Sequence, residues 1–390
     1  MIVGVPRETA PGERRVALVP SLVPSLIKAG HGILVETGAG IRAGYPDEDF
    51  ADREARIADD RTAVFSGADV IFMVQGPGEM DMEVIRPEQV LIGFMDALDN
   101  PRGSEAVAVT GAIAFALELV PRITRAQGMD ALSSMANLAG YKSVLLAADS
   151  LPKIFPMMIT AAGSMSPSRV FVVGAGVAGL QACATAKRLG AVVSAYDVRP
   201  VVQEQVESVG ARFVDFDLDA GDSEDAGGYA KDRGEEFYRR QQEEMSRVVA
   251  SNDVVITTAA VPGKKAPILI TEKMVKGMTP GAVIVDVAAE RGGNCELTVP
   301  GETVVKHGVT ILGTVNLPSM VPYHASQMLG KNIAALFSHL TGSEGRIDTS
   351  SQDEILRGTL LCTGGEVVHP MVREMAGLDD TNPSGEHASP

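Results

Sequence analysis

The sequence has 390 residues, of which 45% are hydrophobic and 22% are charged, as is usual for a globular chain of two or three domains. It carries 34 Lys and Arg against 50 Asp and Glu, which gives a formal net charge of −16. A chain this acidic repels nucleic-acid phosphates and anionic lipid headgroups. It also has no Trp and only 6 Tyr on which bases could stack, so its composition argues against a nucleic-acid-binding protein.

The cysteine, histidine and hydropathy patterns limit the cell compartment and the metal chemistry. Cys183, Cys295 and Cys362 are widely spaced and form no CxxC pair, which favours reduced thiols in a cytoplasmic protein over disulfides or a zinc site. The six histidines are scattered, so we expect no metal site. The N-terminus lacks the apolar core of a secretory signal, and no apolar run reaches the ~20 residues of a membrane span. We therefore expect a chain that does not itself cross a membrane.

The first 120 residues alternate short apolar runs with helical patterns. We expect helices over residues 20–29, 61–67 and 104–111. The predicted strands cover residues 2–6, 32–36, 69–74, 90–94 and 112–116. Near-continuous apolar strands are typical of a parallel sheet that helices cover on both faces. The pattern predicts a doubly wound α/β domain.

A second series of the same kind begins near residue 169. The predicted strands cover residues 169–173, 192–196, 211–214, 253–257, 282–286 and 310–312. The predicted helices between them cover residues 177–189, 201–209, 231–250 and 272–276. The sequence therefore predicts two doubly wound Rossmann-like domains with parallel sheets.

Two further helices, residues 130–148 and 319–340, should bridge these domains around a cleft. The first domain would then be discontinuous, formed by residues 1–135 and 325–378. Residues 136–324 would form the second domain. Residues 379–390 are polar and rich in Pro and Gly, which predicts a flexible tail.

A glycine motif, GAGVAG, lies between the strand at 169–173 and the helix that follows. Gly174 would allow a tight turn, Gly176 would let a pyrophosphate approach the backbone, and Gly179 would let helix and strand pack closely. The phosphates would meet the amide groups at the N-terminus of the helix, including that of Val177. This order of strand, glycines and helix predicts a dinucleotide site.

An acidic residue at the end of the next strand should bind the adenosine ribose. Asp197 occupies that position and would repel a 2′-phosphate, so NAD is favoured over NADP. Arg199 leaves three possibilities open: it could accept a 2′-phosphate, lie over the adenine, or pair with Asp197.

Two more loops follow strand ends on the same edge of the second sheet. Ala260, in the first loop, is expected to contact the ribose and pyrophosphate. Asp286 ends the next strand, and either lies near the nicotinamide or caps its own loop.

Four segments together resemble one family over nearly the whole chain. They are GVPRETAPGERRVALVP, PRITRAQGMDALSSMANLAGYKSV, VVGAGVAGLQA and DVAAERGGNCELT. They are similar to the NAD(H)-binding component (domain I) of proton-translocating NAD(P) transhydrogenase, a relative of alanine dehydrogenase. The resemblance implies catalytic roles at the nicotinamide for Arg122, Gln127, Asp130 and Ser133.

The resemblance also implies a set of coenzyme contacts. Besides the glycines and Asp197, it assigns contacts to the following residues: Gly128, Met129, Val198, Arg199, Gly228, Tyr229 and Gln241. Residues 227–231 match the family's mobile loop, within a long polar insertion that could otherwise be an ordinary surface loop. Gln127 could instead only brace its own loop against Ser133.

The resemblance to alanine dehydrogenase fails at the residues that do chemistry. Arg15 matches that enzyme's carboxylate-binding arginine. Gln75 stands where its substrate lysine is expected, and residues 94–97 contain no histidine where its catalytic one is expected. Amino-acid oxidation needs a group that moves protons at the amine carbon. An amino-acid dehydrogenase is therefore less favoured. The other alternative, a non-catalytic NAD sensor, is less favoured because it would not need Arg122, Gln127 and Asp130.

The resemblance implies Re/Si-specific, proton-translocating NAD(P)+ transhydrogenase activity. NAD(H) would bind to this chain, and NADP(H) would bind to a partner subunit. Other partner subunits would span the membrane. The chain itself would be a homodimer, peripheral on the cytoplasmic face of the inner membrane, with no metal.

Overall fold

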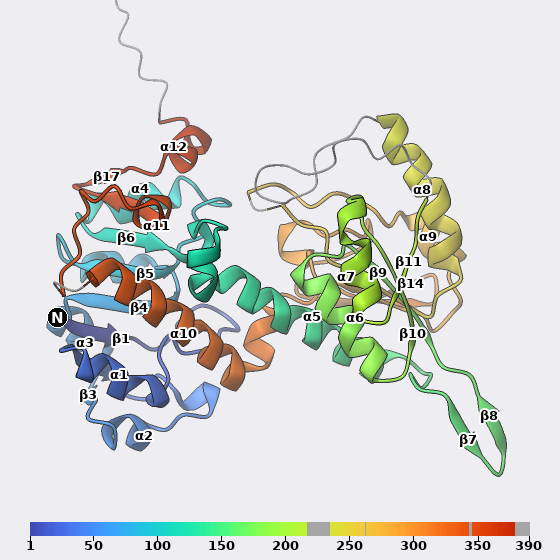
Figure 1. Cartoon of the computed structure of the whole chain (residues 1–390), viewed down its shortest axis with the longest axis horizontal. Helices are drawn as coiled ribbons and strands as arrows, with labels where there is room; N and C mark the ends of the chain where they lie inside the picture. The colour runs from blue at the N-terminus through green and yellow to red at the C-terminus, as the bar shows by residue number, and fades with distance from the viewer. Residues whose placement is uncertain (217–234, 262, 343–344, 379–390) are drawn as a thin grey trace, which may run out of the picture. The chain divides into compact units, whose positions relative to one another are not determined.

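The computed structural model describes residues 1–216, 235–261, 263–342 and 345–378. The chain divides into two compact units, Met1–Leu132 with Pro322–Pro390, and Ser133–Val321 (Figure 1). Each unit is an α/β layer structure built on one large, mainly parallel sheet. The predicted class, two Rossmann-like α/β domains, is confirmed.

The first unit contains an eight-stranded sheet in the order β17-β16-β6-β5-β4-β1-β2-β3. The six strands from β3 to β6 are parallel, and β16 and β17 add an antiparallel edge. Their bounds are β1 (Ile2–Val5), β2 (Gly32–Glu36), β3 (Arg56–Ala58), β4 (Val70–Gln75), β5 (Val90–Phe94), β6 (Ile113–Ala116), β16 (Leu360–Thr363) and β17 (Glu366–Val367). The strand order reverses between β1 and β4, which makes their carboxyl ends the switch point where ligands bind in such sheets.

Helices cover this sheet. They are α1 (Val23–Lys28), α2 (Asp47–Ala51), α3 (Arg61–Gly67), α4 (Gly103–Val109), α10 (Pro322–Thr341), α11 (Glu354–Thr359) and α12 (Pro370–Ala376). Helix α10 buries a stripe of apolar residues spaced three and four apart, and Phe337 from this stripe meets the edge of the Phe72 ring on β4 with the ring centres 5.2 Å apart. The chain therefore returns from the second unit to complete the first.

The second unit contains a seven-stranded sheet in the order β11-β10-β9-β12-β13-β15-β14. The bounds are β9 (Arg169–Val173), β10 (Val192–Tyr196), β11 (Arg212–Phe213), β12 (Val254–Thr257), β13 (Val283–Asp286), β14 (Thr303–Lys306) and β15 (Val309–Leu312). The antiparallel strand β14 lies at one edge. The order reverses between β9 and β12, which is this unit's own switch point.

The helices of the second unit connect these strands. They are α5 (Ala131–Ser150), α6 (Val177–Arg188), α7 (Gln203–Ser208), α8 (Glu235–Ala250) and α9 (Glu272–Gly277), with α5 beginning at the end of the first unit. A two-stranded hairpin, β7 (Met158–Thr160) and β8 (Gly163–Met165), projects from this unit (Figure 1). All six of its strand residues are exposed.

Most predicted elements are present within a few residues, and the differences have a common cause. The strands β3, β7, β8, β14, β16 and β17, each of two to four residues, were not predicted. Strands this short show little periodicity, and β3, β14 and β17 are edge strands with exposed positions. Strand β16 is buried between β17 and β6, and its apolar run is too short to be assigned from its pattern. Both sheets consequently carry antiparallel edges that a purely parallel prediction does not include.

Candidate functional site

The three glycines after β9 each meet a different steric demand. Gly174 has a φ of +95°, which a residue with a side chain adopts only at a cost. A Cβ at Gly179 would lie 1.9 Å from the carbonyl oxygen of Gly174, so only glycine lets α6 approach the turn. A Cβ at Gly176 would meet nothing within 4 Å, so the space above this residue is open. The motif is therefore a tight turn with room on its outer side.

The N-terminus of α6 opens into that space. Gly176 is the N-cap residue and provides no side-chain cap, and Val177 is 37% exposed. The first amides of a helix have no partner within the helix, and with the helix dipole they favour an anion. The end of α6 therefore has the features of a diphosphate-binding site.

Asp197 and Arg199 form a closed pair at the end of β10. The Asp197 carboxylate accepts hydrogen bonds from the Ala175 amide at 2.7 Å and from the Arg199 amide and Nε, both at 2.9 Å. Arg199 Nη2 lies 3.0 Å from the second carboxylate oxygen. Of the three possibilities for Arg199, the structure shows the pairing with Asp197. Asp197 is 9% exposed and directly braces the glycine turn.

The loop after β12 is held against the same turn. The Thr258 hydroxyl donates to the Gly174 carbonyl at 3.0 Å. Asn294, which is fully buried, accepts from the Ala259 amide at 3.0 Å and donates to the Ala259 carbonyl at 2.8 Å. Ala260, the predicted contact, follows directly and is exposed. Thr258 and Asn294 were not predicted because their hydrogen bonds join segments 35 or more residues apart.

Asp286 is a loop-capping residue, the second of its two predicted alternatives. Its fully buried carboxylate accepts from the Thr257 and Thr298 hydroxyls at 3.0 and 2.7 Å, and from the Ala288 and Cys295 amides at 3.1 and 2.9 Å. A Cβ at Gly293 would lie 2.6 Å from this carboxylate. Asp286 thus holds the end of β12 and the loop after β13 together.

The remaining predicted residues lie in the second unit, in the first unit, or outside the described residues. In the second unit, Val198 packs against the apolar cluster of β9, β12 and β13, Gln241 belongs to α8, and Ser133 lies in α5. Gly228 and Tyr229, with the predicted mobile loop at 227–231, lie outside the described residues. Arg122, Gln127, Gly128, Met129 and Asp130 belong to the first unit.

The segment with Gln127 is a short helical turn in the first unit, Thr124–Met129. Ala126 and Met129 point into the core with 1% and 8% exposure, whereas Gln127 and Gly128 between them are exposed. The turn therefore presents Gln127 outwards from two buried anchors.

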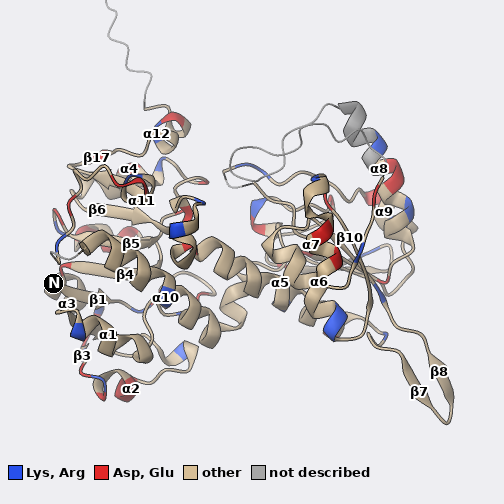
Figure 2. Ribbon diagram, viewed as in Figure 1, with Lys and Arg blue, Asp and Glu red and all other residues tan. Residues whose placement is uncertain are grey.

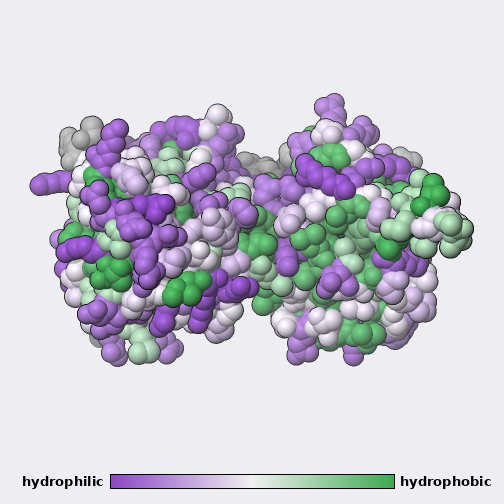
Figure 3. All heavy atoms as spheres, turned by 90° about the horizontal axis from the view of Figure 1, so that it is seen from below, coloured by the Kyte–Doolittle hydropathy of each residue, from purple (hydrophilic) through white to green (hydrophobic). Residues whose placement is uncertain are grey.

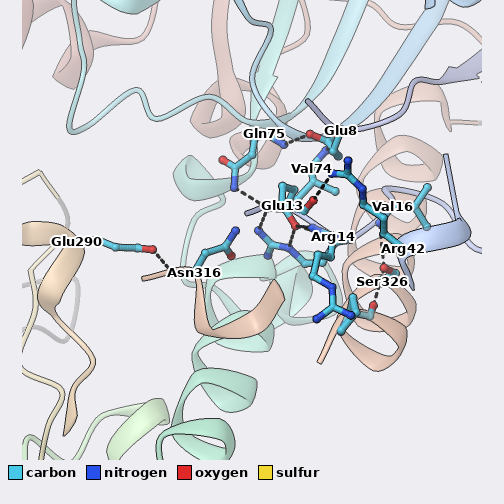
Figure 4. A network of polar contacts seen from close by, with 12 residues as sticks. Glu8, Glu13, Arg14, Val16, Arg42, Val74, Gln75, Glu290, Asn316 and Ser326 are labelled. Atoms are coloured by element: carbon cyan, nitrogen blue, oxygen red, sulfur yellow. Dashed lines mark hydrogen bonds and ion pairs between the residues drawn. The ribbon is translucent and has the colours of Figure 1, made fainter. Parts of the chain in front are cut away.

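The switch point of the first sheet is occupied by a buried polar network (Figure 4). Glu13 accepts from Arg15 Nε at 2.7 Å, from Arg15 Nη2 at 2.6 Å and from Gln75 Nε2 at 3.1 Å. Glu8, which follows β1, accepts from the Val74 amide of β4 at 2.6 Å. Glu13 and Arg15 are 0% and 4% exposed. The arginine that matches the carboxylate-binding residue of alanine dehydrogenase is thus paired with an internal carboxylate.

The two glutamates of this network titrate in opposite directions. Burial opposes ionisation of Glu13, but hydrogen bonds and the positive charge of Arg15 outweigh it and lower the Glu13 pKa to about 2. At Glu8, burial dominates over the backbone hydrogen bond from Val74 and raises the pKa to about 7. The network therefore contains one permanent carboxylate and one that titrates near neutral pH.

Neither a reactive thiol nor a metal cluster is found in the described part of the chain. Burial raises the pKa of Cys183 to about 12 and those of Cys295 and Cys362 to about 11, so all three thiols stay protonated. Among the described residues, no three His, Cys, Asp or Glu side chains are grouped to hold a metal ion. No helix within those residues is long and apolar enough to span a membrane.

Two family profiles together cover nearly the whole chain. Profiles described as the N-terminal and C-terminal domains of alanine dehydrogenase/PNT match residues 4–139 and 143–370. A Rhodospirillum rubrum protein, named as the first part of NAD(P) transhydrogenase subunit alpha, is 46% identical over 95% of this chain and 98% of its own length. Alanine dehydrogenase of Bacillus subtilis is 29% identical over 97% and 96%. A solved structure of transhydrogenase from Sinorhizobium meliloti is 40% identical, covers 95% of this chain and 99% of that one, and has a TM-score of 0.83.

The raised pKa of Glu8 predicts a pH dependence for the stability of the first unit. Between pH 4.5, where an unfolded glutamate titrates, and about 7, the folded state binds more protons than the unfolded state. Stability should therefore fall as pH rises through this window, by up to about 3 kcal/mol, and level off above it. Glu8→Gln should remove this slope, and Glu366→Gln, at an exposed position, should keep it. Hydrogen exchange of the β1 and β4 amides against pH measures both, and equal slopes in the two variants would contradict the assignment.

Proposed function

The chain belongs to the alanine dehydrogenase/PNT family, and on this premise we propose that it is the NAD(H)-binding component of a proton-translocating NAD(P) transhydrogenase. In this proposal, NADH bound to the second unit transfers a hydride directly to NADP+ held by a partner subunit. The reverse transfer uses the same groups.

The observation that carries the proposal is the coenzyme turn of the second unit. The open N-terminus of α6 offers amides to a diphosphate, and Asp197 lies where the adenosine ribose would bind. To accept ribose hydroxyls, Asp197 would have to release some of its four present donors, and the Arg199 side chain is the most mobile of these. Arg199 would then be displaced when the coenzyme binds.

The buried polar network of the first unit favours transhydrogenation over amino-acid oxidation as the activity of this chain. Hydride exchange between two nicotinamides needs no acid or base, only the two reacting carbons held at ~3–3.5 Å in alignment. Amino-acid oxidation needs a proton-transferring group, and here Gln75 donates its amide hydrogen to Glu13 at the expected lysine position. Glu13 also holds Arg15, which would otherwise attract a substrate carboxylate. The second candidate function, an amino-acid dehydrogenase, rests on the family relationship alone.

The proposal requires partner subunits for the rest of the reaction. NADP(H) would bind to one partner, and membrane-spanning partners would carry the protons. The Rhodospirillum rubrum relative is named as one part of a subunit, which is consistent with an assembly of several polypeptides. The present chain would then be peripheral on the cytoplasmic face of the membrane. We propose catalytic roles for Arg122, Gln127, Asp130 and Ser133 at the nicotinamide.

The β7–β8 hairpin supports a homodimer. Met157, Met158, Ile159 and Met165 are 43–72% exposed, and residues 154–168 carry no charged side chain (Figure 2). Seen from below, the hairpin at the right-hand end is largely apolar (Figure 3). Isolated hairpins are marginally stable, and exposed strand edges usually carry Lys or Pro that prevents pairing. An uncharged arm would let two copies of a strongly acidic chain meet without repulsion.

The first prediction of this proposal concerns coenzyme choice. The purified chain should bind NADH and NAD+ at least tenfold more tightly than NADPH, because Asp197 repels a 2′-phosphate. Asp197→Asn should weaken NADH binding by about 10- to 100-fold, since charge-assisted hydrogen bonds contribute ~1.5–3 kcal/mol. Asp253→Asn removes the same charge at the amino end of β12, where Asp253 pairs with Lys153 away from the glycine turn. This variant should leave NADH affinity unchanged. Calorimetry measures the coenzyme affinities of all three proteins. If the native chain bound NADPH as tightly as NADH, the role assigned to Asp197 would be contradicted.

The second prediction concerns Gln127. Gln127→Asn shortens the side chain by one methylene but keeps the amide, so hydride transfer in the complex with partner subunits should fall tenfold or more. NADH affinity should change less than twofold, since the glycine turn and Asp197 provide most of the binding. Gln205→Asn, at an exposed position on α7, is the matched control. Stopped-flow single turnovers measure the rate.

Two results would contradict this role. An unchanged transfer rate would mean that Gln127 only braces its loop, and a loss fully explained by weaker NADH binding would make it a binding residue. The native chain without its partner subunits should form no NADH from L-alanine and NAD+. Sustained alanine-dependent NADH formation would favour the dehydrogenase instead.

The third prediction concerns the hairpin. In analytical ultracentrifugation, the native chain should sediment with the mass of two chains. Ile159→Asp should shift it to one chain, because a charge on the 72%-exposed Ile159 would be buried between copies. Val305→Asp, at a 65%-exposed position on β14, should leave the dimer intact. Dimers in both variants would show that the hairpin is not the contact.

A further inference from the structure

The exposed turn that carries Gln127 is bonded on both sides by the C-terminal portion of the chain. Asn332, on α10, donates its amide hydrogen to the Gly128 carbonyl at 2.9 Å. Arg125 Nη1 donates to Asp353 Oδ2 at 2.8 Å. These bonds join residues 204 and 228 positions apart and reach the turn one residue after Gln127 and two residues before it.

The bond from Asn332 is well protected. Asn332 is 6% exposed on the core-facing side of α10, so its amide donor is shielded from water. Ala126 and Met129 bury the turn on one side, and the Asp130 amide donates to the Gln127 carbonyl at 3.3 Å within it. A directional hydrogen bond to the Gly128 carbonyl fixes the peptide plane between Gly128 and Met129, one peptide unit beyond Gln127.

Asp353 links three elements. Its Oδ1 accepts from the Ile355 and Leu356 amides at 2.9 and 3.0 Å, which caps α11, and lies 2.8 Å from His339 Nε2 on α10. Its Oδ2 accepts from Arg125 on the turn. The cap and the histidine hold the carboxylate in one orientation, so Arg125 meets a fixed partner.

We propose that Asn332 and Asp353 are positioning residues that hold the Gln127 side chain in the orientation needed for hydride transfer. This inference rests on the proposed function. It assigns a role to the C-terminal return of the chain: α10 and α11 hold the turn that carries Gln127, in a unit whose six parallel strands come from the first 120 residues.

Transfer rates are sensitive to this kind of support because the reacting carbons must be aligned to a fraction of an ångström. NADH affinity should not depend on this support, since the diphosphate and ribose of NADH would provide most of the affinity and would bind to the second unit. Loss of either positioning residue should therefore lower kcat and leave the NADH Kd nearly unchanged.

The central variant is Asp353→Asn. Asparagine caps helices as well as aspartate does, so Oδ1 can keep its bonds to Ile355 and Leu356. The new amide nitrogen replaces Oδ2 and faces the Arg125 donor, so this hydrogen bond is lost and only the longer contact of Arg125 Nη2 with Glu354 Oε2, at 3.6 Å, remains. Single-turnover transfer in the reconstituted complex should fall three- to tenfold, with the NADH Kd changed less than twofold. Asp60→Asn is the matched control, since Asp60 caps α3 in the same unit by accepting from the Ala63 amide.

The second variant is Asn332→Ala, with Ser326→Ala as its control. Both residues are buried polar side chains on α10, but the Ser326 hydroxyl accepts from the Val16 amide at 3.0 Å rather than bonding the turn. Asn332→Ala should slow transfer by a similar factor, and Ser326→Ala should not. Thermal melts of the pair check that both variants fold to the same extent.

A double-mutant cycle separates positioning from general stability. If Asp353 acts through Gln127, Asp353→Asn should change the rate less than twofold in a Gln127→Ala background. Full additivity of the two losses would overturn the proposal, as would an unchanged rate in Asp353→Asn or a loss matched by Asp60→Asn.

Hydrogen exchange of the isolated chain tests the anchoring without any partner. The amides of residues 125–130 should exchange at least fivefold faster in Asp353→Asn and Asn332→Ala, and at the native rate in the controls. Unchanged exchange would overturn the proposal even if transhydrogenation is confirmed. Absence of NADPH formation by the native complex would instead contradict the proposed function, while faster exchange in these variants would still establish the anchoring.

Discussion

The contact on which the proposed coenzyme site depends is the close approach of α6 to the turn after β9. A Cβ at Gly179 would lie 1.9 Å from the Gly174 carbonyl oxygen, so any other residue would push the helix away from the sheet. Because the helix begins so close to the strand, its free amides open directly at the switch point between β9 and β12. Asp197 then reaches the Ala175 amide, and Thr258 reaches the Gly174 carbonyl. The positions of the helix amides and of the Asp197 carboxylate relative to the turn follow from this one packing constraint.

The two units share a strand order and use their switch points differently. In each sheet the parallel strands follow the order in which a doubly wound fold places a crevice at the reversal. In the second unit the crevice is open above Gly176. In the first unit Glu8, Glu13, Arg15 and Gln75 occupy the corresponding position, where they bond one another and the end of β4. A network whose charges are paired internally gives a small anionic substrate little to bind, which is consistent with a subunit that positions a coenzyme and leaves the acceptor to a partner.

The sequence could predict the second unit's turn because its residues act locally. The three glycines and Asp197 lie within 24 positions, and each type suits one steric or electrostatic demand. The role of Asp286 stayed open because a strand-end carboxylate looks the same in sequence whether it faces a ligand or four internal donors. Asn294, Asn332 and Asp353 could not be predicted, since each acts on a segment far away in the chain and belongs to no short motif. The short strands β14, β16 and β17 were missed for a related reason: their partners, not their own periodicity, define them.

The central claim is that a hydride passes directly from NADH on this chain to NADP+ on a partner, and isotope transfer tests it most directly. The chain, reconstituted with its partner subunits, would be given NADH carrying one deuterium at the transferred position of C4, together with NADP+ in ordinary water. Direct transfer predicts NADPH that carries the deuterium in full at a single face of C4, as mass spectrometry and proton NMR would show. Loss of the label to solvent, or NADPH labelled only when the reaction runs in deuterated water, would contradict direct transfer between the two nicotinamides.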